Sequence, residues 1–341
     1  MIKKLITTVS IVFSVIVFGC AGIFCVYLYQ PYGVLPQEIH IPKGTPTPSI
    51  IQTLVEKNVI SNPTFFKIYL TLARKLKKIR AGDYVFPTTN TPLEVASMLQ
   101  TGDFKRYRIT LIEGWNLKQM ATYLQDIQFA NAEKFLNLCF DPEFIRELGF
   151  EGKSLEGYLF PDTYEIYFPR DERELIVKFV HRFGEIYSPA WRQRTQEMGW
   201  SLKDIVTLAS IVEKETGVPE ERPLVASVFH NRLQRKMPLE ADPTVIYGLP
   251  SFSGNLTRRD LETPTAYNTY TLPGLPSGPI ANPGKASLEA VLYPAKSDYL
   301  FFVSKNDGSH HFSTNMRDHG MAVRRYQSWI QAAEAPPTVS K

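Results

Sequence analysis

The sequence predicts an α+β protein with a single amino-terminal transmembrane helix, a small strand–helix–helix–strand unit and a larger mixed α+β domain. Three observations predict this plan. An uncharged apolar run occupies residues 5–29. Short strand-like runs beside glycine turns then alternate with amphipathic helical patterns along the rest of the chain. Finally, 341 residues are enough for two or three domains, each with its own core.

The apolar run at residues 5–29 predicts a transmembrane helix. It is long enough to span a bilayer, whereas the apolar region of a signal peptide has about 7–15 residues. Lys3 and Lys4 precede it and no Lys or Arg follows until Lys43, so residues 1–4 should be a cytoplasmic stub and the rest of the chain exported. A lipoprotein signal ending at Cys20 is the alternative. It fits poorly because the chain stays apolar beyond that residue.

Composition and cysteine content exclude several classes of site. A net charge of +4 gives no case for binding nucleic acid. Cys139 is the one cysteine outside the predicted span, so the exported part can form no intramolecular disulfide and offers no cysteine pair for zinc. His310 and His311 are neighbours on a predicted strand and point to opposite faces, which argues against a shared metal. We therefore expect no metal and no cofactor.

Residues 30–37 read as a linker, and residues 38–105 as the small unit. A strand at 39–41, a helix with Ile50 and Leu54 on its apolar face, a second aromatic helix near Phe66 and a strand at 82–86 follow in order. A basic stretch, residues 74–80, precedes the second strand. The order of elements resembles a LysM-like module, a fold that grips N-acetylated glycans. A small packing domain or spacer is the alternative.

The larger domain is expected at residues 106–333, with a disordered tail at 334–341. The segment SLEGYLFPDTYEIYF (154–168) carries Tyr158, Phe160 and Tyr164. We assign these three residues to the hydrophobic core in preference to a sugar-binding site. Glu156 is either a second site carboxylate or a surface acid, and we expect the latter. Residues 299–304 and 309–313 flank Asn-Asp-Gly and predict a hairpin.

Residues 263–284 contain five prolines and predict a stiff, irregular loop. Its polar and aromatic residues could line a sugar-sized groove, and a rigid surface wrap is the alternative. The residues concerned are Tyr267, Asn268, Thr269 and Tyr270.

The helix predicted at residues 201–215 is the centre of the chain. Ser201 and Asp204 form a capping-box pattern at its start. Glu213 and Glu215 each border its apolar face and lie roughly 160° apart around the axis, so they cannot face each other. Periodicity does not choose between them. Asp242 before Pro243 fits a helix N-cap, a structural role that alone could explain it.

Several blocks carry a resemblance to a known family. Together they resemble the endolytic murein transglycosylases, the MltG/YceG-like family. The blocks are ASIVEKET (209–216), VFHNRL (228–233), DPTVIYG (242–248), LETPTAYNTY (261–270), GLPSGPIANPG (274–284) and YLFFV…GSHHFS (299–313), with SLEGYLFPDTYEI upstream. Ser277 stands where proline is common in the family.

The resemblance implies a single-pass anchor in the bacterial inner membrane, a LysM-like subdomain and a catalytic domain on the outer, periplasmic side. The implied activity is cleavage of the β-1,4 bond between N-acetylmuramic acid and N-acetylglucosamine inside nascent peptidoglycan strands. It leaves 1,6-anhydromuramic acid ends and terminates glycan elongation. Peptidoglycan strands are the implied partner, and peptidoglycan synthases are candidate partners.

The resemblance also names the catalytic residue, Glu213, as the first acid of VEKET. One carboxylate suffices because the substrate's own C6 hydroxyl attacks, whereas ordinary glycosidases use two. Its position at the rim of an apolar face should raise its pKa. Polar type and membership of the blocks name the candidate substrate-binding residues Asn231, Asp242, Tyr247, Asn268 and Tyr270. The alternatives are a hydrolysing muramidase, with Glu156 or Asp242 as second carboxylate, and a non-catalytic glycan-binding scaffold.

Overall fold

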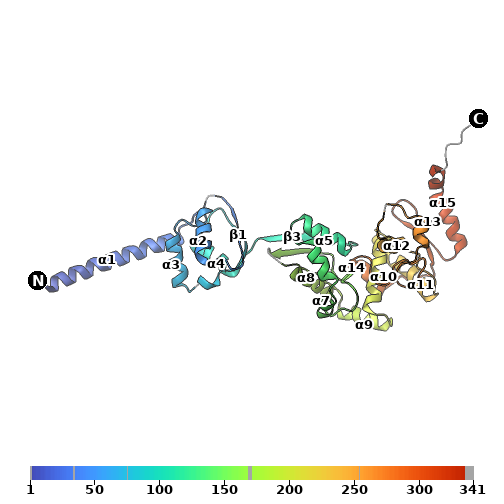
Figure 1. Cartoon of the computed structure of the whole chain (residues 1–341), viewed down its shortest axis with the longest axis horizontal. Coiled ribbons are helices and arrows are strands. Elements are labelled where there is room, and N and C mark those ends of the chain that lie inside the picture. Colours follow the sequence, from blue (N-terminus) through green and yellow to red (C-terminus); the bar gives the residue numbers. More distant parts are fainter. Residues whose placement is uncertain (1, 34, 75, 168–170, 253, 335–341) are drawn as a thin grey trace, which may run out of the picture. The chain divides into compact units, whose positions relative to one another are not determined.

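A computed structural model describes residues 2–33, 35–74, 76–167, 171–252 and 254–334 of the chain (Figure 1). The fold is mixed α+β, as the sequence predicts. Two compact units make it up: residues 1–109 with 164–169, and residues 110–163 with 170–341. The predicted disordered tail falls on residues 335–341, outside the described residues, apart from its first residue, which ends the last helix.

The first unit begins with α1 (Ile2–Tyr29), the predicted apolar helix. Within it, Ile6–Tyr29 has a mean hydropathy of 2.6 and is long and apolar enough to cross a membrane. A signal sequence would satisfy the same criterion.

The rest of the first unit follows the predicted order of elements. These are β1 (Gln37–Ile41), α2 (Thr47–Glu56), α3 (Pro63–Leu72), the 3-10 turn η1 (Leu76–Lys78), β2 (Gly82–Phe86) and α4 (Pro92–Thr101). β1 and β2 pair antiparallel, with Ile39 opposite Tyr84. The helices cover this ribbon, and Leu54, Phe66 and Tyr84 are completely buried between them. The apolar periodicity predicted here therefore forms a real core.

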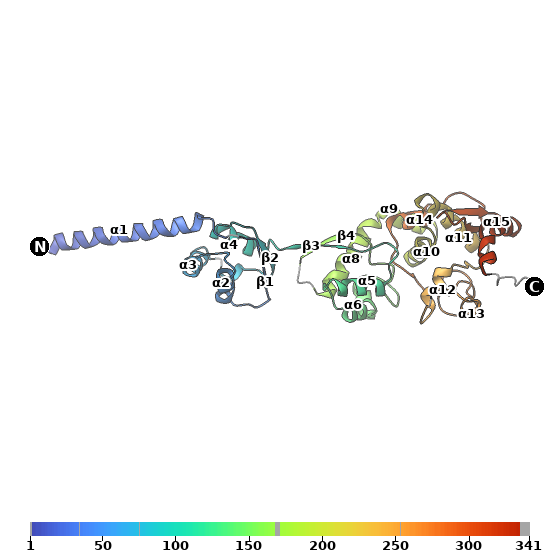
Figure 2. The same cartoon turned by 90° about the horizontal axis from the view of Figure 1, so that it is seen from above.

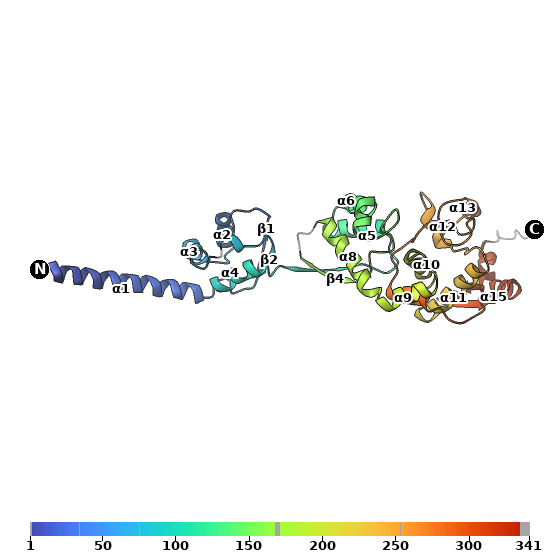
Figure 3. The same cartoon turned by 90° about the horizontal axis from the view of Figure 1, so that it is seen from below.

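β3 (Arg106–Thr110) and β4 (Thr163–Tyr167) form a second two-stranded sheet, along which the chain passes between the units. The second unit is mainly helical (Figures 2 and 3). Its elements are α5 (Leu117–Asp126), α6 (Ala132–Cys139), α7 (Pro142–Glu147), α8 (Glu172–Ile186), α9 (Pro189–Glu197), α10 (Leu202–Glu215), η2 (Pro219–Glu221), α11 (Arg222–Gln234), α12 (Asp242–Gly248), α13 (Arg258–Glu262), α14 (Lys285–Leu292), β5 (Phe301–Ser304), β6 (His310–Ser313) and α15 (Met316–Glu334).

α10 is the central helix of the second unit. It packs against α9, α11, α12 and α14, and residues 205–212 are all buried. The predicted capping box at Ser201 is present, with Asp204 as its partner. Because residues 205–212 of α10 lie in the core, the helix holds Glu213 and Glu215 at a fixed position at its carboxyl-terminal end.

Other predictions for this part are also confirmed. Tyr158, Phe160 and Tyr164 are buried. β5 and β6 form the predicted antiparallel hairpin. Residues 263–284 contain no helix or strand.

Candidate active site

Glu213 lies at the carboxyl-terminal end of α10 and its side chain is only 6% exposed. Its Oε2 accepts a 2.8 Å hydrogen bond from the backbone N–H of Gly284, just before α14. Its Oε1 lies 3.6 Å from Nη2 of Arg222, the first residue of α11. Both carboxyl oxygens of Glu213 thus face donors within the protein.

A second carboxylate, Glu113, lies beside the same contact. A Cβ built on Gly284 would fall 2.0 Å from Oε1 of Glu113, so the Glu113 side chain lies directly against this glycine. Gly114 has φ +77°, and a Cβ on it would lie 3.5 Å from Cγ of Glu213. The turn before α5 and the loop before α14 therefore enclose the end of α10.

The surroundings of Glu113 perturb its titration. Desolvation of its carboxyl group raises the pKa of Glu113, and the charge of Glu213 raises it further, while Arg222 opposes both. The sequence analysis did not identify Glu113 as a site residue. The one local signal is the glycine that follows it, which allows the left-handed turn.

Glu215 occupies a different environment. Burial of its carboxyl group, and then the charge of Asp242, raise the pKa of Glu215 to about 8, whereas Arg232 acts in the opposite direction. Asp242 is exposed and accepts a 2.6 Å hydrogen bond from the Tyr270 hydroxyl. This environment favours the protonated form of Glu215, which lies near a polar pair that solvent can reach.

Glu156 is buried, at 3% exposed, so the expectation of a surface acid was wrong. Its carboxylate accepts hydrogen bonds from the Leu117 N–H (3.2 Å), the Tyr247 hydroxyl (2.9 Å) and the Asn282 side-chain amide (3.1 Å). Burial raises the pKa of Glu156 to about 7, although these hydrogen bonds lower it. Sequence alone could not reveal these partners because they come from segments far apart in the chain.

Asn282 connects Glu156 to the contact around Glu213. It is completely buried, its backbone carbonyl accepts from the N–H of Gly114, and its backbone N–H donates to Trp115. Gly284, two residues further on, donates to Glu213. The buried carboxylate therefore positions both segments that surround the end of α10.

Two of the predicted substrate-binding residues are buried or engaged with backbone. Asn268 is completely buried, and its amide donates to the carbonyls of residues 260, 261 and 263. Thr269 is also buried, so the prediction that these two line a groove was wrong, because they hold the loop together from inside. Asn231 donates its amide to the carbonyls of Ser297 and Tyr299.

The remaining predicted residues, Asp242, Tyr247 and Tyr270, lie close to Glu215 or to Glu156. Tyr270 contacts Asp242 beside Glu215, and the Tyr247 hydroxyl reaches Glu156. Asp242 is the first residue of α12 and not its N-cap, which is Ala241, so the predicted capping role was wrong by one position. The carboxylate of Asp242 is therefore not committed to the helix end.

No metal site is found among the described residues, where no group of three or more His, Cys, Asp or Glu side chains converges. His310 instead pairs with Glu221, with Nδ1 2.6 Å from Oε2.

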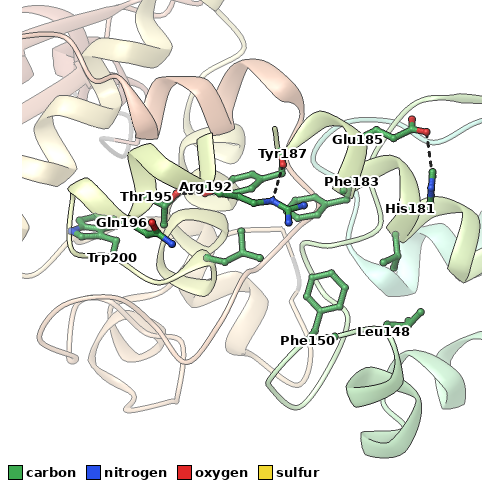
Figure 4. A pocket seen from close by; sticks show the side chains of 14 residues that line it. Leu148, Phe150, His181, Phe183, Glu185, Tyr187, Arg192, Thr195, Gln196 and Trp200 are labelled. Atoms are coloured by element: carbon green, nitrogen blue, oxygen red, sulfur yellow. Dashed lines mark hydrogen bonds and ion pairs between the residues drawn. The ribbon is translucent and has the colours of Figure 1, made fainter. Parts of the chain in front are cut away.

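A cavity of about 710 Å³ lies at the other end of α10 (Figure 4). Phe150, Phe183 and Trp200 line it, with Arg192 donating to the Tyr187 carbonyl at 3.2 Å. Leu202 is also part of the lining. Glu213 is eleven residues later, roughly 16 Å further along the helix axis at 1.5 Å per residue. This cavity is therefore separate from the acids.

Comparisons with known proteins agree with the resemblance read from the sequence. A model described as the YceG-like family matches residues 39–325. The chain is 32% identical over 311 residues to a Bacillus subtilis protein named endolytic murein transglycosylase, with 85% of each chain covered. A Streptococcus pneumoniae protein of the same name is 26% identical and covers 90% of this chain, which spans 62% of its length. A solved structure of a yceG-like protein from Listeria monocytogenes has a TM-score of 0.59 at 30% identity, covering 84% of this chain and 98% of its own.

Proposed function

This chain belongs to the YceG-like family, and we propose that it is a membrane-anchored endolytic peptidoglycan transglycosylase. Its substrate is the β-1,4 bond between N-acetylmuramic acid and N-acetylglucosamine within a glycan strand. The observation that carries the proposal is the placement of Glu215 at the end of the buried helix α10, next to the exposed Asp242–Tyr270 pair, in surroundings that raise its pKa. A proton donor next to an exposed carboxylate suits cleavage through an oxocarbenium-like transition state.

The reaction needs one group that acts first as acid and then as base. Glu215 donates its proton to the glycosidic oxygen as the bond from C1 of the muramic acid to that oxygen breaks. The C6 hydroxyl of the same sugar then attacks C1, and the Glu215 carboxylate takes the hydroxyl proton. The acid is regenerated and the product ends in a 1,6-anhydro ring. Intramolecular attack also avoids the need to fix a water molecule.

The choice between the two glutamates rests on their partners. The sequence expectation named Glu213, whose carboxylate faces an N–H donor and an arginine. Both of its carboxyl oxygens are thus engaged, one by the loop before α14 and the other by the first residue of α11. Glu215 lies in a different environment, in which burial and then the charge of Asp242 raise its pKa. We therefore assign proton transfer to Glu215 and the positioning of the α14 loop to Glu213.

Asp242 and Tyr270 are the groups proposed to support positive charge at C1 and to orient the sugar. Asp242 is exposed, and it retains a free carboxylate oxygen when Tyr270 donates to Oδ1. Asn231, Tyr247 and Asn268 act through the backbone or the buried network that their side chains hold.

A pair of conservative variants tests the assignment. Glu215→Gln removes the proton donor, and we expect a loss of about 10²–10⁴-fold in the release of anhydro-ended products. Glu213→Gln keeps a carbonyl oxygen for the Gly284 N–H, so we expect it to retain substantial activity. Glu262→Gln, on the exposed helix α13, is the matched control. Full activity in Glu215→Gln together with loss in Glu213→Gln would reverse the assignment.

The same digest separates the rival functions. Mass spectrometry distinguishes an anhydro end from the hydrolysed end of a muramidase, which is one water heavier. A muramidase would need a second carboxylate; Glu156 is buried in its network and Asp242 is the remaining candidate. A non-catalytic scaffold would release neither product.

We further propose that α1 is the uncleaved single-pass anchor, with residues 1–4 in the cytoplasm and both units outside the inner membrane. The apolar length of α1 and the position of Lys3 and Lys4 support this topology. Residues 38–105 would act as a LysM-like glycan-binding module and residues 106–333 as the catalytic domain. Peptidoglycan synthases are the candidate partners for a chain that ends strand growth at the membrane.

A further inference from the structure

The carboxyl-terminal end of α1 packs against α3 and α4 of the same unit, so the folded part of this unit (residues 37–109, here called the module) is held at the end of the helix. The Tyr27 hydroxyl donates to the Asn62 carbonyl at 2.8 Å, and the Phe65 ring contacts Tyr27 and Phe24 at 5.4 and 5.7 Å. Asn62, at the start of α3, contacts residue 27 of α1, and Phe65, further along α3, also contacts residue 24. From its start, α3 therefore runs toward the amino-terminal end of α1. In all three views α3 is the part of the folded module on the side of the α1 amino terminus (Figures 1 to 3).

The apolar stripe of α3 continues beyond this contact into solvent. Phe65, Ile68 and Leu72 follow one another at spacings of three and four residues, so they lie on one face of the helix. Ile68 is 41% exposed and Leu72 is 72% exposed. The stripe thus begins beneath α1 and then lacks a covering element.

Basic residues flank the uncovered stripe along the sequence. Residues 63–80 contain six Lys or Arg and no Asp or Glu. Lys67, Arg74 and Lys78 are exposed and form no ion pair with any other described residue. Apolar side chains with flanking Lys and Arg are the pattern of a helix that lies in the interface of an anionic membrane.

We propose that the α3 face, defined as Lys67, Ile68, Leu72, Arg74 and Lys78, rests on the anionic phospholipid surface of the membrane that α1 spans. The apolar stretch Ile6–Tyr29 rises about 36 Å, slightly more than a hydrocarbon core of about 30 Å, so its last turns reach the headgroups. α3 is packed on these turns, at the depth where Ile68 and Leu72 meet the acyl boundary and the basic side chains meet phosphate. The contact restrains the module against the membrane and is independent of the catalytic assignment.

The test measures lipid contact at single positions of the full-length chain in vesicles. Cys20→Ala and Cys25→Ala remove the exposed thiols, and Cys139 is buried and unreactive. An environment-sensitive fluorophore is then placed at Leu72→Cys, with Glu38→Cys on β1 as control, since β1 lies on the other side of the module from α3 (Figure 1). The vesicles contain phosphatidylcholine and phosphatidylglycerol, with a fraction of the lipid doxyl-labelled near the headgroup.

We expect strong doxyl quenching of the label at residue 72 and little at residue 38. Lys67→Gln, Arg74→Gln and Lys78→Gln together should reduce this quenching sharply. Each basic residue at an anionic surface changes a docking equilibrium about fivefold, so the three change it roughly hundredfold before screening by salt.

Several results would overturn the proposal. Equal quenching at residues 72 and 38 would show that α3 does not touch lipid. Undiminished quenching in vesicles of phosphatidylcholine alone would exclude recognition of anionic headgroups. Shielding of residue 72 from an aqueous quencher in dilute detergent, with crosslinks between chains, would identify a second copy as the occupant in place of lipid.

Discussion

Replacement of Asp242 by Asn tests how the site keeps Glu215 protonated. The substitution removes the charge of Asp242, which is the second-largest cause of the raised pKa of Glu215; the largest is burial. The side-chain oxygen of Asn can still accept the hydrogen bond from Tyr270, which is 2.6 Å long in the wild type. The variant therefore changes the electrostatics of the site with little change of shape.

The structure sets the size of the effect. With a pKa of about 8, Glu215 is about 90% protonated at pH 7, whereas a glutamate with the ordinary pKa of about 4.3 would be less than about 1% protonated. For the proposed proton donor, these surroundings thus increase the protonated fraction at pH 7 by a factor of a few hundred. In Asp242→Asn the pKa of Glu215 falls but stays raised by burial, so part of this factor is lost at pH 7 and is recovered at lower pH.

The assay is the pH dependence of kcat/KM for the release of anhydro-ended products, which reports the acid of the free enzyme. In the wild type we expect activity to fall as the pH rises through about 8. In Asp242→Asn this fall in activity at alkaline pH, the alkaline limb of the profile, should occur at lower pH. Tyr270→Phe keeps the charge of Asp242 and should leave the limb at or above its wild-type position. An unmoved limb in Asp242→Asn would refute the reasoning.

Three further predictions concern stability and geometry. Gly284→Ala puts a methyl group where the exposed, flexible Glu113 side chain lies, so this side chain should swing away at a cost of only about 0.5 kcal/mol in thermal unfolding, with Gly217→Ala, which has open space, as control; a much larger loss would show that Glu113 is held in place. Glu156 has a folded pKa of about 7, above its unfolded value, so the free energy of unfolding should fall by about 3 kcal/mol as the pH rises from about 4 through 7. Glu156→Gln should remove this dependence on pH, and the same dependence in wild type and variant would contradict the prediction. Arg232→Lys removes a guanidinium group that donates to three backbone carbonyls and to Glu240. It should lower the free energy of unfolding in denaturant by about 2–4 kcal/mol, whereas Arg235→Lys, at an exposed position, should change it little.

The buried network also explains why one loop arrangement is found at the end of α10. Glu156 and Asn282 satisfy donors and acceptors from segments before α5, around residue 159 and before α14. A buried polar group without a hydrogen-bond partner costs free energy, so one of these segments can rearrange only if the others rearrange with it. The positions of Glu113 and Gly284 follow from this constraint.

The sequence by itself determined the elements whose signals are local. The length of the apolar run gave α1, the 3.6-residue period and capping box gave α10, and the Asn-Asp-Gly turn gave the β5–β6 hairpin. Order of elements was enough to predict the β1–α2–α3–β2 arrangement. In each case the deciding interactions join residues close in the chain, which a pattern can represent.

Only the tertiary structure distinguished the surroundings of the acids. Glu213 and Glu215 have equivalent places in the periodicity of one helix, and they differ because Gly284 and Arg222 face one while Asp242 and burial act on the other. Glu156 likewise changed from an expected surface acid to a buried one. Titration depends on desolvation and on charges brought together by folding, and neither is encoded in the spacing of residues along the chain.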